Sequence, residues 1–447
     1  MADCLDAAVA AVMQQVTRER LLDVVVGLVE HPSPTGAERG LAEWVTEWIT
    51  QSSDVQADTC RLRARVQVID DRQANAVAVL TGVANGPSTL LYAPIDTFTT
   101  GDERYDVPGA AASMRPDMEP RAVVAGDLVQ GLGAGNPKGH AACVLVALAA
   151  LATAGVELRG DVVAGFGAGG MPAFALDGIG ADGRANTGHG VGAGFLLERG
   201  FTTDAAVIAK PGWAVSHEEV GLVWLDVRVP GIHTYAGSRH RLPYRNAVAL
   251  AGVVAQRLED WLADYAERHE HATMRPQGIV SSVSGGLGHL AASTPAEVRL
   301  RLDLRLTTRQ TPAGVTREVR SFLDELGREL DAELAVEQVA AIPATRTDPS
   351  EPVVAATVAA WESVAGVRHE PIRQHSGATD ANVLRMRGVP TARVGMPKVT
   401  RGLQGEDVDF TLGMNLVDLD EMHRLVEILV RTVLALQEEP EGERTQE

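Results

Sequence analysis

Gln374-His375-Ser376-Gly377-Ala378-Thr379-Asp380-Ala381, followed by Arg387-Gly388-Val389-Pro390, is the stretch that decides the fold of this chain. Its glycine and its short polar side chains predict a tight turn that opens a short helix, with an acid at the start of that helix. A buried strand is expected to begin at the proline. A turn, a helix and a strand in this succession are typical of an α/β domain.

The length and charge of the chain limit its class. A chain of 447 residues favours two domains over one. Its 40 basic and 59 acidic residues give a net charge of −19, which repels nucleic acid and anionic membrane surfaces. We find no basic leader segment and no apolar run long enough to span a membrane. The sequence therefore predicts a cytoplasmic protein whose partner is a small molecule, with no nucleic acid and no membrane.

The first 215 residues show α/β patterning. Helix patterns accompany five β-like runs, at 64–69, 76–80, 89–93, 161–166 and 205–209. Asp96 comes just after the third run, and an acid in this position is where α/β sheets place chemistry. Residues 98–130 form a polar excursion, which in a compact domain is usually functional or mobile.

An inserted domain interrupts this pattern at 216–341. Its runs follow the order β-α-β-β-α-β of the ferredoxin-like module. The α/β patterning resumes at 342–437, and the acidic tail 438–447 is expected to be disordered. The sequence therefore predicts an α/β fold whose mixed-sheet core, with helices on both faces, is interrupted by a ferredoxin-like lid.

This organisation and its turn motifs resemble the di-zinc metallopeptidase and amidohydrolase family of acetylornithine deacetylase, succinyl-diaminopimelate desuccinylase, aminoacylase and glutamate carboxypeptidase. The resemblance covers nearly the whole chain. It rests on the turn at 376–381 with Gly388-Val389-Pro390, and on further motifs at 33–36, 133–139, 246–248 and 302–305. It implies hydrolysis of an amide or related C–N bond in a small acylated amino acid, and a homodimer formed through the lid.

The resemblance also implies a pair of zinc ions. The residues at the matching positions of this chain, however, are of types that rarely bind zinc. The family's ligand and base positions fall at Pro94, Asn136, Gly169-Gly170, Lys210 and near Leu412. None of these is a good zinc ligand, and the lysine would repel a cation. We therefore expect no zinc at the ancestral site, no metal-ligating residues and no cofactor.

A lysine ammonium can take over part of the role of a metal, because it balances a carboxylate and polarises a carbonyl. On this basis the expected catalytic residues are Lys210, Asp96 and Tyr235. The expected substrate-binding residues are Asn136, Lys138, Arg305, His375 and Asp380. A second interpretation is that Lys210 only neutralises neighbouring acids in an inactive site.

Other polar side chains have plainer explanations. We expect His217, His233 and His240 on a solvated surface, His140 in packing or capping, and Cys143 in the core. The basic cluster Arg239, His240, Arg241 and Arg245 is either solvated or binds an anion or a partner subunit.

Two functions follow from the sequence. The first is a divergent amidohydrolase that works without the ancestral zinc pair. The second is a non-catalytic relative that keeps the cleft to bind a small ligand or a partner subunit.

Overall fold

The computed structural model describes residues 2–52, 61–173 and 188–438, and the chain divides into two compact units. Unit 1 takes Met1–His217, Thr347–Pro371 and Thr379–Glu447, and unit 2 takes Glu218–Arg346 and Ile372–Ala378. Unit 2 thus holds residues 342–346 and 372–378, which the sequence-based division assigned to the core. Apart from Glu438, the tail expected to be disordered lies outside the described residues.

Unit 1 is built on a six-stranded sheet with the order β1-β2-β6-β3-β7-β14. Strands β6, β3, β7 and β14 run parallel to one another, whereas β2 pairs antiparallel with both β1 and β6. The strands are β1 Leu62–Val68, β2 Ala74–Leu80, β3 Thr89–Pro94, β6 Val162–Gly167, β7 Ala205–Ala209 and β14 Thr391–Val394. The mixed sheet confirms the predicted fold class.

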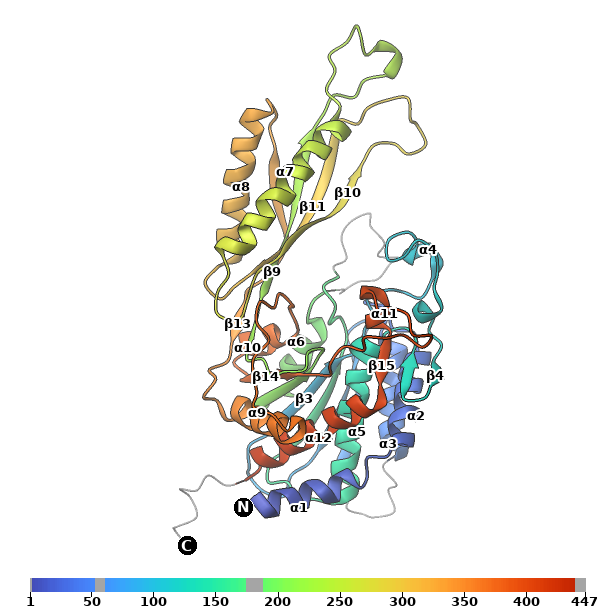
Figure 1. The fold of residues 1–447 in the computed structure, drawn as a ribbon, viewed down its shortest axis with the longest axis vertical. Coiled ribbons are helices and arrows are strands. Elements are labelled where there is room, and N and C mark those ends of the chain that lie inside the picture. Colours follow the sequence, from blue (N-terminus) through green and yellow to red (C-terminus); the bar gives the residue numbers. More distant parts are fainter. Residues whose placement is uncertain (1, 53–60, 174–187, 439–447) are drawn as a thin grey trace. The chain divides into compact units, whose positions relative to one another are not determined.

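Helices cover both faces of this sheet (Figure 1). Alternate residues of each strand point to opposite faces, so Leu91 joins one hydrophobic core and Leu90 joins the other. The larger core packs against α1 Ala2–Met13, α2 Arg18–Glu30, α3 Arg39–Ser52, α5 Gly139–Ala154, α9 Pro352–Ala365 and α12 Leu419–Leu436. The smaller core packs against α6 Val191–Glu198 and α10 Ala381–Met386.

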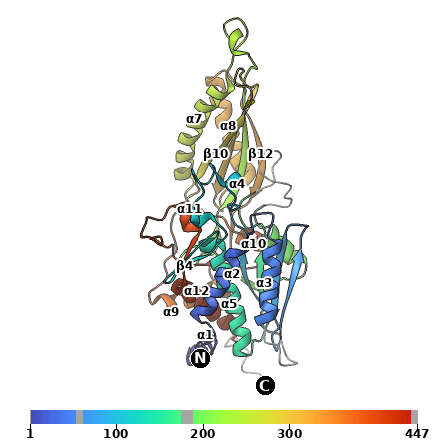
Figure 2. The ribbon, with the colours of Figure 1, turned by 90° about the vertical axis from the view of Figure 1, so that its right-hand side faces the viewer.

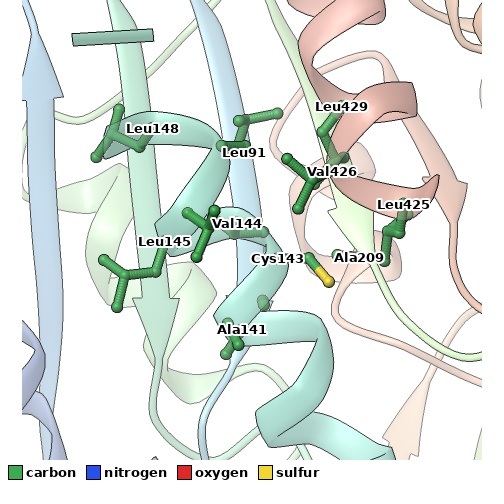
Figure 3. Close-up of a cluster of buried hydrophobic side chains, with 14 of the residues drawn as sticks. Leu91, Ala141, Cys143, Val144, Leu145, Leu148, Ala209, Leu425, Val426 and Leu429 are labelled. Atoms are coloured by element: carbon green, nitrogen blue, oxygen red, sulfur yellow. The ribbon is translucent and has the colours of Figure 1, made fainter. Parts of the chain in front are cut away.

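The centre of the larger core is the contact between α5 and α12. Figure 3 shows Cys143 and Val144 of α5 facing Leu425, Val426 and Leu429 of α12. The Cys143 thiol is fully buried and donates to the Met422 carbonyl oxygen at 3.5 Å, so Cys143 is a core residue.

One helical stretch among the described residues, Ala134–Ala154, is long and apolar enough to cross a membrane by length and composition. However, 83% of its most apolar window is buried inside the fold, as expected for the central helix of a globular core. The sequence-based estimate placed only its second part in a helix. The first part, Ala134–Lys138, is a separate turn that is interrupted at Asn136.

The polar excursion at 98–130 is largely ordered. It contains α4 Glu103–Asp106, a short 3-10 turn at Pro116–Met118, β4 Val123–Ala125 and β5 Leu128–Gln130. Strand β5 pairs antiparallel with β4 on one side and with β15 Leu416–Asp418 on the other. The excursion is therefore joined to the segment that precedes α12, and this segment includes α11 Phe410–Met414.

Unit 2 contains a four-stranded antiparallel sheet with the order β10-β11-β9-β12. Its elements are β9 Gly221–Pro230, α7 Ala247–Arg268, β10 Gly278–Gly285, β11 Glu297–Leu306, α8 Pro312–Glu329 and β12 Ala335–Ile342. This is the predicted β-α-β-β-α-β order. Helices α7 and α8 cover one face of the sheet and share its core (Figure 2).

The α5–α12 contact yields a stability prediction. We expect Leu429→Ala to lower the free energy of unfolding by about 2–5 kcal/mol, because it removes a fully buried side chain and leaves a cavity. The control is Leu287→Ala, where the leucine is 52% exposed and the expected change is below about 0.5 kcal/mol. Urea denaturation followed by circular dichroism measures both. Equal losses for the two variants would contradict this packing.

Candidate functional site

Three predicted site residues of unit 1 lie at the same end of the sheet. Asp96 follows β3, Lys210 follows β7 directly, and Asp380 precedes α10. Because β3 and β7 run parallel, their carboxyl ends meet at one edge. The structure therefore brings Asp96, Lys210 and Asp380 to one place.

Asp96 is a fully buried carboxylate held by three donors. Its Oδ1 accepts the Gly170 N–H at 2.8 Å, and its Oδ2 accepts the Met171 N–H at 2.8 Å and the Thr35 hydroxyl at 2.7 Å. The loop after β6 approaches so closely that a Cβ at Gly170 would lie 2.3 Å from the Pro94 Cβ. Asp96 therefore fixes the local backbone and has little capacity left for a ligand.

Asp380 is also fully buried, but neither of its carboxylate oxygens has a hydrogen-bond partner in the described chain. The Tyr92 hydroxyl lies beside it without a well-formed hydrogen bond. Burial raises the pKa of Asp380 to about 7; the Lys210 ammonium opposes this rise and the Asp96 carboxylate adds to it. Asp380 thus titrates near neutral pH.

Lys210 is 5% exposed, and its ammonium acts on two neighbours. It favours the charged form of Asp380 and disfavours the charged form of His140. The segment after β14 lies tightly against it, since a Cβ at Gly395 would come 1.8 Å from the Lys210 carbonyl oxygen. Asp380 is therefore one electrostatic partner of Lys210 in this cluster.

His140 and Glu38 complete the buried polar cluster. Burial, followed by the charge of Lys210, lowers the pKa of His140 to about 3, so this imidazole is neutral at physiological pH. Burial and the Asp96 carboxylate raise the pKa of Glu38 to about 8, while its Oε1 accepts the N–H groups of Gly36 and Gly169. Sequence reasoning missed Glu38, although its place directly after the turn at 33–36 was a usable signal.

Among the described residues of unit 1, two neighbouring pockets have volumes of about 670 Å³ and about 250 Å³. They share Asn136, Phe410 and Met414, and His140 lines the larger one. Asn136 was a predicted binding residue. Its buried Oδ1 has no hydrogen-bond partner among the described residues, and its Nδ2 lies 3.5 Å from the Met414 sulfur.

The aromatic side chains at the smaller pocket were not predicted. Phe98 and Phe410 meet edge to face with ring centroids 6.5 Å apart. They come from opposite ends of the sequence, so no local pattern links them.

An ionic network that runs from the buried Asp117 to the exposed Asp409 holds these two segments together. Arg115 donates to Asp117 at 2.8 and 2.9 Å and to Asp409 at 2.6 Å. Asn415 donates to Asp117 at 3.1 Å and accepts the Gly133 N–H at 2.8 Å. The wall of the smaller pocket is therefore fixed by contacts between the excursion and the segment around α11.

The remaining predicted residues are one further lysine of unit 1 and three residues of unit 2. Lys138 lines neither pocket; its fully buried ammonium donates to the His31 carbonyl oxygen at 2.9 Å, and burial lowers its pKa to about 7. Tyr235, Arg305 and His375 belong to unit 2. Tyr235 is 61% exposed, Arg305 forms a two-point salt bridge with Asp303, and the His375 Nε2 lies 3.1 Å from the Thr273 hydroxyl.

The raised pKa of Asp380 predicts a pH-dependent stability. Its folded-state pKa of about 7 exceeds its ordinary value of 3.8, so the folded state holds this proton more tightly than the unfolded state does. Stability from this group is present at low pH and is lost as the pH rises through about 7. Between pH 3.8 and about 7, we expect the unfolding free energy of Asp380→Asn, relative to wild type, to increase by about 1.4 kcal/mol per pH unit.

Urea denaturation at a series of pH values measures this difference. Lys210→Met is the matched variant, because removal of the opposing cation extends the titration of Asp380 to higher pH. A difference between Asp380→Asn and wild type that stays constant with pH would refute the assignment.

Comparison with known proteins identifies the fold. The sequence profile of peptidase family M20/M25/M40 matches residues 91–435. Among solved structures, an aminopeptidase from Bacillus cereus is 16% identical with a TM-score of 0.62, covering 95% of this chain and 100% of that chain. Human carnosine dipeptidase 1 is 12% identical with a TM-score of 0.68, covering 97% and 98%. At these identities the structures show the fold alone.

The expectation that the protein needs no cofactor is wrong. Members of the matched family are typically dinuclear metal-dependent peptidases. A similar structure from Bacillus subtilis, 14% identical with a TM-score of 0.59 over 94% of this chain and 98% of that chain, is described as a dinuclear metal-binding peptidase. The replaced residues were read as loss of the metal, and family membership overturns that inference.

The described residues do not by themselves supply a donor set. Within 2–52, 61–173 and 188–438, no group of three or more His, Cys, Asp or Glu side chains gathers closely enough to hold a metal ion.

The family profile spans well over half of the residues. The chain therefore belongs to peptidase family M20/M25/M40.

Proposed function

We propose that this protein hydrolyses the amide bond of a small acylated amino acid or a similar compound. The family implies hydrolysis of a C–N bond. The observation that carries the proposal is the buried Lys210–Asp380 pair. His140, whose pKa the Lys210 charge helps to lower, and Pro211, the residue after Lys210, line a pocket of about 670 Å³, a volume that suits a small organic ligand.

The proposed roles follow from charge and burial. The Lys210 ammonium stabilises the negative charge that develops on the carbonyl oxygen. Asp380, with its pKa of about 7, is suited to accept a proton from water near neutral pH. Water adds to the carbonyl carbon, the C–N bond breaks, and the proton passes to the leaving amine. Asp96 keeps the loop after β6 in place through its three hydrogen bonds.

Roles in unit 2 are proposed from the resemblance. Tyr235 carries an exposed hydroxyl that would donate to the substrate carbonyl. Arg305 and His375 would bind polar groups of the substrate. We further propose that the protein acts in the cytoplasm.

The test is amine release from a panel of N-acyl amino acids. Assays use the protein as purified and after addition of Zn²⁺, Mn²⁺ or Co²⁺, because family members are typically metal-dependent. We expect Lys210→Met to lower kcat at least 100-fold, as loss of a group that stabilises transition-state charge does. The control is Arg63→Met, which removes an exposed cation on β1.

Three other results are informative. Absence of amine release under every condition would refute the proposed hydrolase activity. Ligand binding without turnover would favour the non-catalytic alternative. Full activity in Lys210→Met would exclude this lysine as the catalyst.

We also propose that two copies of the chain associate through unit 2. Strand β10 lies at the edge of its sheet and exposes Ile279 (54%) and Val283 (68%). An exposed apolar edge strand is a template for pairing with another chain, and a second copy presents the same edge.

Light scattering after size-exclusion chromatography tests the dimer. We expect twice the chain mass of 47.3 kDa for the wild type and a shift to the monomer for Val283→Lys, because a charge on the edge strand opposes pairing. Val83→Lys, at a 57% exposed valine of unit 1, should leave the dimer intact. A monomeric wild type would refute the proposal.

A further inference from the structure

The two pockets of unit 1 differ in what they offer a ligand. They meet at Asn136, Phe410 and Met414, so one ligand can extend through both. The smaller pocket has a volume of about 250 Å³. A cavity of roughly 150 Å³ is enough to bind benzene, so a phenyl ring with its linking atom fits.

The smaller pocket presents mainly apolar surface. Phe98, Leu132, Phe410 and Met414 contribute carbon and sulfur to its lining. Three of its polar side chains, Thr97, Thr411 and Asn415, are already engaged within the protein. The Thr97 hydroxyl donates to the Thr99 carbonyl, the Thr411 hydroxyl donates to the Ala110 carbonyl, and both ends of the Asn415 amide are hydrogen-bonded. An apolar group therefore enters without leaving these polar groups unsatisfied.

The junction between the pockets carries an unused acceptor. The buried Oδ1 of Asn136 has no hydrogen-bond partner in the described chain, because the other end of this amide faces the Met414 sulfur. A buried acceptor left unpaired costs about 1–3 kcal/mol. Asn136 lines both pockets, so a turn of its side chain would bring this oxygen to a ligand N–H, and a secondary amide supplies one such donor.

The larger pocket contains one lysine, Lys398, together with four acidic side chains. Its acidic side chains are already engaged: Asp407 with Arg401, Asp409 with Arg115, Glu421 with Arg424, and Asp418 with two backbone N–H groups of α12. Lys398 is exposed and forms no ion pair with the described residues. It is therefore the cation available to a ligand carboxylate.

We propose that the substrate is an amino acid with a bulky apolar acyl group. The acyl group occupies the smaller pocket, the amide N–H donates to the Asn136 Oδ1, and the carboxylate lies near Lys398. This inference rests on the proposed function, because it specifies the substrate of the same site.

The test uses ligands that cannot be hydrolysed as amides. N-methanesulfonylglycine and N-benzenesulfonylglycine share an N–H and a carboxylate and differ only in the apolar group. Isothermal titration calorimetry with the full-length protein measures both dissociation constants. We expect the benzenesulfonyl compound to bind at least tenfold more tightly.

Variants test which side chains produce the preference for the benzenesulfonyl compound. Phe98→Ala with Phe410→Ala should reduce the preference below threefold, and both phenylalanines are more than half exposed, so the fold tolerates their loss. Lys398→Met should weaken both compounds by a similar factor and keep the preference. Val68→Ala, at a 48% exposed valine of β1, should change neither value.

The outcomes separate this inference from the proposed function. Equal binding of the two compounds, or a full preference in the double phenylalanine variant, overturns the inference. Hydrolysis of N-acyl amino acids without regard to acyl size also overturns the inference, but it supports the proposed hydrolase activity. Selective binding without any hydrolysis supports the pocket assignment and refutes the proposed hydrolase activity.

Discussion

The buried carboxylate of Asp96 is the contact on which the arrangement of the site depends. It joins three segments that are distant in sequence: the turn at Thr35, the end of β3, and the loop at Gly170 and Met171. A carboxylate that accepts three hydrogen bonds holds its negative charge in place at low energetic cost. Burial raises the pKa values of Asp380 and Glu38 to about 7 and about 8, and the nearby Asp96 carboxylate adds to each rise.

Much of the fold was predictable from the sequence because its signals are local. Alternation of apolar residues located the strands of both units, and helical spacing located α7, α8 and α12. The turn before Asp380 was predictable because glycine and short polar side chains encode it within a few residues. The family resemblance placed Asp96, Lys210 and Asp380 in one cleft. The convergence of parallel strand ends at one edge of the sheet explains why Asp96 and Lys210 meet there.

The pockets could not be predicted, because no local pattern encodes them. Phe98 and Phe410 meet because long-range contacts join their segments, among them the bond from Arg115 to Asp409, 294 residues away in the sequence. Lys138 was expected to bind substrate from its place in a glycine-rich turn, whereas its ammonium donates to the carbonyl that follows α2. The expected absence of a cofactor failed for a related reason. A comparison of single positions shows where this sequence differs from the family's zinc ligands. It does not show which side chains the folded chain brings together to bind a metal.

The scarcity of lysine has a practical consequence. The sequence contains only three lysines among its 40 basic residues, namely Lys138, Lys210 and Lys398, so the other 37 are arginines (40 − 3 = 37). Two of the three are buried, and Lys398 is exposed at the larger pocket. Guanidinium groups remain protonated at all physiological pH values and react poorly with amine-directed reagents. A mild acylating reagent therefore meets one accessible lysine side chain, so a label or a covalent inhibitor can be directed to this pocket in the unaltered protein.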